Sequence, residues 1–135
     1  MTAALLLIIA ASQPLACPVL ARHTLREAAE HRVRPALLDA VAKVETGCDG
    51  HKVGSHGEKS AWQIKPGGSA ARGRKRGLAK ASVGACLAAR HLRKLLDLCD
   101  GSEIAALGLY QGARHRCSEE PTPYASKVLA VAGEP

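Results

Sequence analysis

The stretch ALLDAVAKVETGCDGHKVGSHGEKSAWQIKP, residues 36–66, decides the fold of this 135-residue chain. It begins with apolar residues at helical spacing and continues with a segment rich in Gly, His and Lys. It ends with a short apolar segment around the only Trp of the sequence, Trp62. This order predicts an amphipathic helix over residues 36–46, an exposed loop, and a strand or helix start over residues 61–64.

The predicted helix carries a single glutamate on its apolar face. Pro35 suits a first helical position, and Gly47 suits a C-cap. Glu45 lies four residues after Val41 and seven after Leu38, so it shares their face of the helix. Burial against apolar side chains would raise the pKa of this carboxyl, and Glu45 is therefore a candidate general acid. The alternative is that Glu45 only ends the helix and points to solvent.

The first 21 residues contain no Lys, Arg, Asp or Glu. Residues 3–11 form an apolar run that is too short to span a bilayer. We interpret residues 1–21 as a signal peptide removed before Arg22, and residues 22–135 as one exported domain, periplasmic or extracellular. Two alternatives stay open, a retained N-terminal anchor helix and a lipid on Cys17. The lipid is less favoured because Pro14 stands where such signals carry an aliphatic residue.

Four cysteines follow the predicted leader, an even number that favours disulfide bonds in an exported domain. Three connectivities are possible, and we favour the one that joins successive segments, Cys48–Cys86 with Cys99–Cys117. A zinc site would be a competing use of the cysteines, with co-ligands among His51, His56, His91 and His115. No CxxC or HExxH spacing occurs, so we expect neither a metal nor a cofactor.

The sequence has no Phe, and its aromatic residues are Trp62, Tyr110 and Tyr124. A core of Leu, Val, Ile and Ala favours closely packed helices, and disulfides would offset the modest apolar burial. No internal repeat and no alternating strand pattern is found. We therefore predict a mainly α, small helical domain stapled by disulfides, and we expect a monomer. Its helices are expected at residues 25–32, 36–46, 78–98, 104–110 and 124–131, with caps at Thr24, Ser82 and Ser102.

The formal net charge of +7 comes entirely from residues after the predicted leader, and it favours anionic surroundings. The densest basic run is RGRKR, residues 72–76, which we interpret as a solvated loop. Nucleic-acid binding is the alternative, but no aromatic residues are interleaved for base stacking. We expect no nucleic-acid partner, and an acidic polymer of the cell envelope suits an exported protein better.

Residues 44–66 resemble the catalytic domain of the soluble lytic transglycosylases, within the goose-type lysozyme superfamily. The signature of that family is a helix ending in Glu-Ser, a loop with a Ser, and then Gly-Ala-x-Gly-Leu-Met-Gln-Ile-Met-Pro. Here Glu45 and Thr46 stand for Glu-Ser, and GEKSAWQIKP, residues 57–66, falls at the family's spacing. Residues 109–112 and 122–128 are similar to two later family motifs, so the resemblance covers residues 34–129.

The chain departs from this signature at several positions. Gly54 replaces the loop Ser, although Ser55 is adjacent. Glu58 replaces Ala, Ser60 replaces the second Gly, and Gln111 replaces the Asn of a later motif. These changes affect the residues expected to bind the sugar more than they affect Glu45, the candidate acid.

The resemblance implies a lysozyme-like domain that cleaves the β-1,4 bond between N-acetylmuramic acid and N-acetylglucosamine in peptidoglycan. Glu45 would protonate the departing oxygen and then, as a carboxylate, take the proton of the muramic C6 hydroxyl, which closes a 1,6-anhydro ring. The resemblance also suggests that Tyr110 orients Glu45 by a hydrogen bond. Substrate-binding residues are expected among Ser55, Trp62, Gln63, Tyr110 and Gln111.

Three other functions stay open. A hydrolytic muramidase would use water in place of the C6 hydroxyl, with Glu58 as a second carboxylate. A non-catalytic module would keep the same fold as a glycan-binding cleft. A basic, disulfide-stapled protein would act on anionic surfaces by charge alone.

Overall fold

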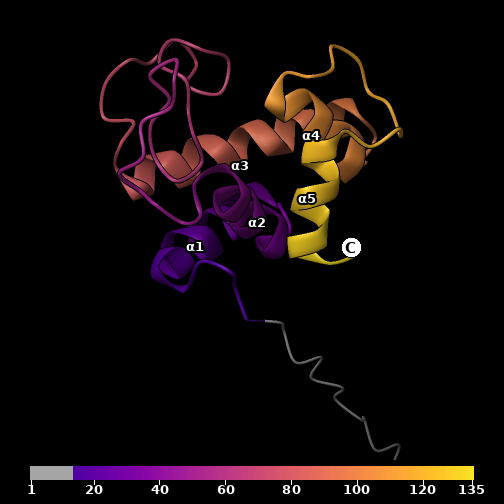
Figure 1. The fold of residues 1–135 in the computed structure, drawn as a ribbon, viewed down its shortest axis with the longest axis horizontal. Helices are drawn as coiled ribbons and strands as arrows, with labels where there is room; N and C mark the ends of the chain where they lie inside the picture. Colours follow the sequence, from indigo (N-terminus) through magenta and orange to yellow (C-terminus); the bar gives the residue numbers. More distant parts are fainter. Residues whose placement is uncertain (1–13) are drawn as a thin grey trace, which may run out of the picture.

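The computed structural model describes residues 14–135, which fold into a small bundle of α-helices (Figure 1). Among these residues no strand forms, and the only β-pairing is an isolated antiparallel bridge between Lys59 and Ile64. The mainly α class is therefore confirmed. The elements are η1 (Pro18–Leu20), α1 (Ala21–His31), α2 (Pro35–Thr46), α3 (Ala81–Leu98), α4 (Glu103–Gln111) and α5 (Pro123–Ala132).

Local sequence signals locate some helix ends and misplace others. α2 begins at Pro35 and ends at Gly47, which adopts the left-handed conformation with φ 63°, as expected. Ser102 caps α4 by accepting a hydrogen bond from the backbone N–H of Ala105. The predicted cap at Thr24 is wrong, because α1 continues from η1 and encloses this residue. Ser82 also lies inside its helix rather than at the cap.

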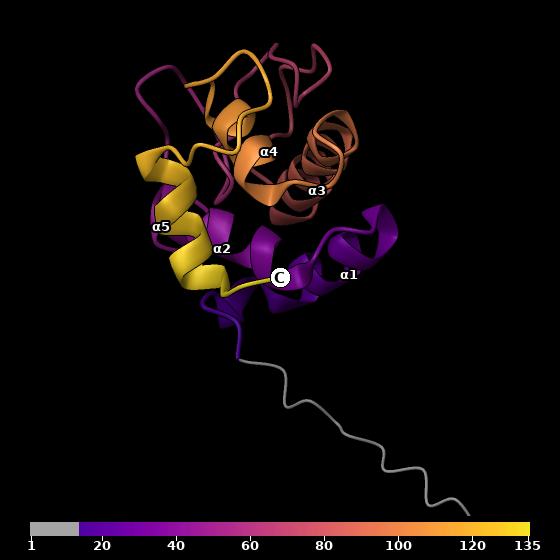
Figure 2. The ribbon, with the colours of Figure 1, turned by 90° about the vertical axis from the view of Figure 1, so that its right-hand side faces the viewer.

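Helix α2 lies at the centre of the bundle, between α1 and α5, and α3 packs against α1 and α4 (Figures 1 and 2). Leu37, Leu38 and Val41 of α2 are completely buried. The aromatic residues of the core are Tyr124 of α5 and Trp62, which lies in the long segment between α2 and α3, and the rest of the core is mainly aliphatic. A core of small aliphatic side chains lets the helices approach closely, as the composition predicts.

The two disulfides are Cys17–Cys48 and Cys99–Cys117. The second pairing is confirmed, but the expected Cys48–Cys86 bond is wrong. The N-terminal segment runs back along α2, which brings Cys17 to Cys48, while Cys86 is the free cysteine of residues 14–135. The alternative of a lipid on Cys17 is also contradicted, because its sulfur is already bonded.

The segment before α1 is part of the folded domain. The buried carboxylate of Asp39 accepts hydrogen bonds from the backbone N–H groups of Ala16 and Cys17, at 2.7 and 2.8 Å. Leu20 is only 6 % exposed. A cut before Arg22 would remove these contacts and the partner of Cys48. The predicted cut between residues 21 and 22 thus falls inside the folded domain. Residues 1–13 lie outside the described part of the chain, so removal of a leader stays a prediction.

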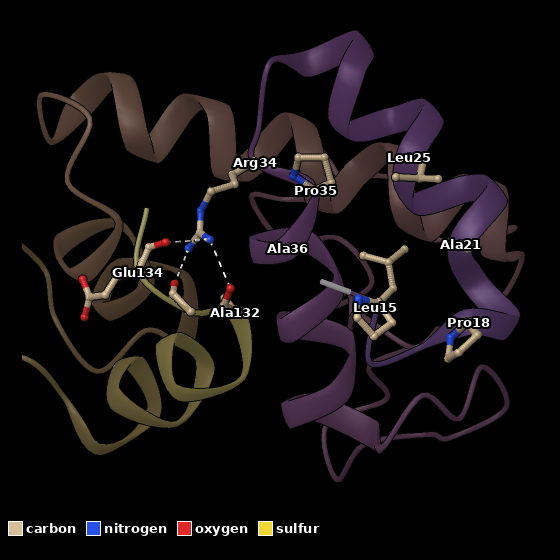
Figure 3. A pocket seen from close by; sticks show the side chains of 11 residues that line it. Leu15, Pro18, Ala21, Leu25, Arg34, Pro35, Ala36, Ala132 and Glu134 are labelled. Atoms are coloured by element: carbon tan, nitrogen blue, oxygen red, sulfur yellow. Dashed lines mark hydrogen bonds between the residues drawn. The ribbon is translucent and has the colours of Figure 1, made fainter. Parts of the chain in front are cut away.

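Arg34, the residue before α2, connects three helices. Its guanidinium donates to both carboxylate oxygens of Glu103 in α4, at 2.8 and 3.1 Å. It also donates to the carbonyls of Ala132 and Gly133 at the end of α5, at 3.1 and 2.9 Å, and Figure 3 shows it directed at this helix end. The last carbonyls of a helix have no partner within it, so the arginine satisfies them.

No α-helix between residues 14 and 135 has both the length and the apolar character that a membrane crossing requires.

We expect Asp39→Ala to lower the free energy of unfolding by about 2 kcal/mol, because two buried backbone N–H groups lose a charged acceptor. Urea denaturation of the oxidised protein measures this change. Asp97→Ala is the matched control, since Asp97 pairs with Arg93 at the surface and should change stability by less than about 1 kcal/mol. Equal effects of the two substitutions would contradict the proposed importance of Asp39.

Candidate active site

Glu45 lies in the last turn of α2 and is half-buried, as the helical pattern predicts. The next residue, Thr46, is buried, and its hydroxyl lies 3.0 Å from the carbonyl oxygens of both Ala42 and Ala61. The first of these carbonyls belongs to α2 and the second to the long loop between α2 and α3. The end of the helix and this loop are therefore held together beside the glutamate.

Trp62 holds the same loop against α2. Its side chain is 0 % exposed, and its indole N–H donates to the carbonyl of Leu38 at 2.9 Å. The expectation that Trp62 contacts substrate is wrong, because the ring belongs to the core. In a chain without Phe, this indole is the largest side chain available to anchor a loop on α2.

The residues around Trp62 form a tight reversal. Lys59 and Ile64 exchange two backbone hydrogen bonds, at 2.8 and 2.9 Å, so residues 60–63 form a turn. Ser60 and Gln63 both have positive φ, 67° and 54°, which is unfavourable for residues with a side chain. Such strain is held only where neighbouring contacts fix the backbone, and it commonly marks functional sites.

Ser60 is accommodated by a glycine on the facing helix. Its side chain is buried against Gly84 of α3, and a Cβ at residue 84 would collide with the Ser60 hydroxyl and Cβ. The hydroxyl also accepts a hydrogen bond from the N–H of Trp62 at 3.2 Å. The replacement of the signature Gly by Ser60 therefore leaves the turn intact, because the small residue stands on the other side of the contact.

The surroundings of Glu45 favour its protonated form. Burial is the main cause, because it removes water from the charged carboxylate and raises the pKa. The negative charge of Glu58 raises the pKa further. The Tyr124 hydroxyl and the Lys52 ammonium oppose this by stabilising the carboxylate, but the net shift is upward. A carboxyl with a raised pKa can deliver a proton near neutral pH.

The tyrosine directed at Glu45 is Tyr124 of α5. Its hydroxyl is buried close enough to stabilise the carboxylate, although it meets hydrogen-bond geometry with no group of residues 14–135. The Tyr110 hydroxyl, which was expected to orient Glu45, donates to the carbonyl of Trp62 at 3.2 Å instead. Tyr124 was visible in the sequence as part of the closing motif, but nothing there assigned it to the acid.

Glu58 forms the other side of the site. Its carboxylate accepts a hydrogen bond from the backbone N–H of His56 at 3.0 Å, and its carbonyl accepts one from Gly54 at 2.9 Å. The Glu58 carboxylate occupies the space next to Gly54 where a Cβ would project. In this chain the acidic side chain therefore takes the volume that the loop Ser of the signature would need.

The pKa values of the two carboxyl groups are shifted in opposite directions. The pKa of Glu58 is lowered, chiefly by its own backbone N–H and also by the N–H and imidazole of His56 and by Lys65. Burial and the Glu58 charge raise the pKa of Glu45. Opposite pKa shifts in neighbouring carboxyl groups make the group with the raised pKa the candidate acid.

Gln63 also belongs to this site. Its amide nitrogen donates to the carbonyls of Lys52 and Ser60, at 3.1 and 3.0 Å. Its carbonyl oxygen faces Gly54, where a Cβ would come within 2.6 Å of it. The side chain is thus fixed with its acceptor oxygen toward the loop that carries Glu58, which fits a role in holding a sugar N–H or hydroxyl group.

Two other expected binding residues lie at the surface. Ser55 is exposed, and its hydroxyl is 3.1 Å from Nδ1 of His56. Gln111 is the exposed last residue of α4, and its neighbours Tyr110 and Gly112 line the adjacent groove instead. The structure therefore brings Glu45, Glu58 and Gln63 to one side of the loop, and it leaves Ser55 and Gln111 exposed at its margins.

A groove of about 530 Å³ begins at Gln63 and Tyr110 and runs between the loop, α3 and the segment after α4. Its lining includes the basic side chains Lys65, Lys94 and Arg114 together with His91 and His115. A larger cavity of about 920 Å³ lies at Pro35, the opposite end of α2 from Glu45, and is lined mainly by Pro, Leu and Ala (Figure 3). The 530 Å³ groove is the one lined by Gln63 and Tyr110, which are expected to bind glycan.

Solved structures of similar fold include the lytic transglycosylase Slt of Pseudomonas aeruginosa, in an inactive Glu-to-Gln mutant form. That structure matches with a TM-score of 0.70 and 17 % sequence identity, over 82 % of this chain and 23 % of its own. The fold is that of the lytic transglycosylases. The 70-kDa soluble lytic transglycosylase of Escherichia coli matches with a TM-score of 0.64, and a complex of a 70-kDa soluble lytic transglycosylase with bulgecin A matches with 0.62, both at 16 % identity.

These lytic transglycosylases are much longer proteins. The chain spans about a fifth of the E. coli enzyme, 19 % of its length, while 88 % of this chain is covered. No protein-family model matches the sequence, and no curated protein sequence matches it significantly. The lytic transglycosylase likeness is therefore a likeness of fold, and the lysozyme-like helical domain expected from the sequence is confirmed.

We expect Tyr124→Phe to raise the pKa of Glu45 above its wild-type value, because the carboxylate loses the hydroxyl that stabilises it. Carbon-detected NMR titration of the Glu45 carboxyl measures the change. Tyr110→Phe is the control, since that hydroxyl donates to the Trp62 carbonyl and not to the acid. A larger upward shift in the Tyr110 variant would contradict this assignment.

Proposed function

We propose that this protein is a peptidoglycan lytic transglycosylase with Glu45 as its single general acid and base. The observation that carries the proposal is the half-buried Glu45 carboxyl, whose pKa is raised at the end of α2 beside a fixed, strained turn. The lytic transglycosylase fold supports it, as does the inactive state of the P. aeruginosa Glu-to-Gln mutant.

The proposed reaction uses the Glu45 carboxyl twice, first as a proton donor and then as a proton acceptor. Protonated Glu45 delivers its proton to the glycosidic oxygen as the bond between N-acetylmuramic acid and N-acetylglucosamine breaks. The C6 hydroxyl oxygen of the muramic residue then bonds to C1, and the Glu45 carboxylate takes the hydroxyl proton. The products are a 1,6-anhydromuramic end and a new N-acetylglucosamine end, and the enzyme returns to its starting protonation state.

The remaining parts of the site are assigned to binding. Gln63 holds an acetamido or hydroxyl group through its free carbonyl oxygen, because its amide nitrogen is already occupied. The basic groove next to it, with Lys65, Lys94 and Arg114, attracts the carboxylates of peptidoglycan or of other anionic envelope polymers. Peptidoglycan and envelope polymers are partners of an exported enzyme, so the proposal includes export of this protein.

We expect Glu45→Gln to reduce the release of soluble muropeptides by at least about 100-fold, since the proton donor is lost while the shape is kept. Mass spectrometry of the products from purified peptidoglycan measures the yield and the anhydro end. Glu119→Gln is the control, because Glu119 is an exposed glutamate that does not line the groove. Unchanged activity of the Glu45 variant would remove Glu45 from the mechanism, and glycan binding without products would favour a non-catalytic module.

A hydrolytic muramidase is the second candidate function, and Glu58 is the observation that favours it. Its ionised carboxylate lies close enough to affect Glu45, so it could hold and deprotonate a water molecule. The product would then carry a reducing end, heavier by one water than the anhydro product. The transglycosylase remains the first proposal because it requires only the acid that the site provides.

We expect Glu58→Gln to keep formation of anhydro products, because the C6 hydroxyl gives its proton to Glu45. Product mass and initial rates on purified peptidoglycan are the measurements. Under the hydrolytic alternative the wild-type products carry reducing ends, and Glu58→Gln lowers their yield by about 100-fold or more. Reducing ends that depend on Glu58 would replace the transglycosylase by the muramidase.

A further inference from the structure

Three metal-ligating side chains meet where α1 packs on α3, apart from the candidate active site. Glu27 and His31 are one helical turn apart on α1, and Cys86 faces them from α3. Nε2 of His31 lies 3.4 Å from a carboxylate oxygen of Glu27 and 3.8 Å from Sγ of Cys86. One ligand atom from each of the three residues lies within 4.8 Å of the others, and all three are half-buried.

The geometry argues against a nucleophilic triad. In a triad the imidazole uses one nitrogen for the nucleophile and the other for the carboxylate. Here a single nitrogen, Nε2 of His31, faces both the carboxylate and the thiol. The three groups thus converge on one point between them, which is the arrangement that a bound cation requires.

The separations between the ligand atoms fit a tetrahedral zinc ion. With Zn–N near 2.05 Å, Zn–O near 2.0 Å and Zn–S near 2.3 Å, tetrahedral angles place N and O about 3.3 Å apart and N and S about 3.6 Å apart. The corresponding distances in the structure are 3.4 and 3.8 Å. These two separations would have to change by only a few tenths of an ångström, and the third, between the Glu27 oxygen and the Cys86 sulfur, is within 4.8 Å.

We propose that Glu27, His31 and Cys86 bind a Zn²⁺ ion, with water in the fourth position. The Cys86 thiol gives up its proton to solvent, and the thiolate and the Glu27 carboxylate balance the two charges of the ion. Glu30 adds negative charge near Cys86 and Arg90 opposes it. The ion would link the end of α1 to α3. It would also assign a role to Cys86, the cysteine of residues 14–135 that is in neither disulfide.

This site does not depend on the proposed glycosidase activity. The test is a titration of the full chain, both disulfides intact, with Co²⁺ as a spectroscopic substitute for zinc. We expect one equivalent to bind, with a near-ultraviolet thiolate-to-cobalt band and tetrahedral visible absorption, and Zn²⁺ to displace it. Cys86→Ser abolishes the band, and Glu27→Gln or His31→Gln weakens Zn²⁺ binding by about tenfold or more.

His23→Gln is the control, because His23 also lies on α1 but outside the cluster. It should bind Zn²⁺ as the wild type does, and Zn²⁺ should raise the melting temperature of both. Glu27→Gln keeps the proposal testable if the cysteine variant does not fold. Absence of the thiolate band, Zn²⁺ binding unaffected by Glu27→Gln and His31→Gln, or a dimer linked through Cys86 that binds no metal would each overturn it.

Discussion

The contact of the Trp62 indole with α2 is the constraint on which the candidate site depends. Residues 47–80 contain no helix, so nothing within this segment fixes its position beside Glu45. The buried indole supplies that anchor through its packing and through its hydrogen bond to Leu38. Thr46 adds a second link between helix and loop one residue after the acid. The acid and its loop are therefore both fixed to the core.

Features encoded within a few neighbouring residues could be predicted from the sequence. The helix that carries Glu45 follows from its apolar spacing, and its ends follow from Pro35 and Gly47. Burial of the carboxyl follows from its place on the apolar face. The spacing from Glu45 to Gln63 indicated the loop, and the structure places Gln63 where its oxygen faces Gly54. Each of these inferences needs only local geometry.

Contacts between distant segments could not be predicted in the same way. The Cys17–Cys48 bond depends on the N-terminal segment turning back along α2, which no local pattern reports. Tyr110 and Tyr124 both lie within family-like motifs, and only the packing of α5 on α2 shows that the Tyr124 hydroxyl stabilises the Glu45 carboxylate. Both cases depend on which distant segments of the chain the fold brings into contact.

The close contact between Gly54 and Glu58 implies that substitutions at residues 54 and 58 depend on each other. A side chain at residue 54 would enter the space of the Glu58 carboxylate and the Gln63 amide oxygen, so a serine there requires either a small residue 58 or a Glu58 side chain turned away from the loop. Descendants of this chain should therefore change the two positions together, as Gly with Glu or as Ser with Ala. A protein with a serine at residue 54 alone would have to turn the Glu58 carboxylate away from the N–H of His56, and intermediates between the two pairs should be rare.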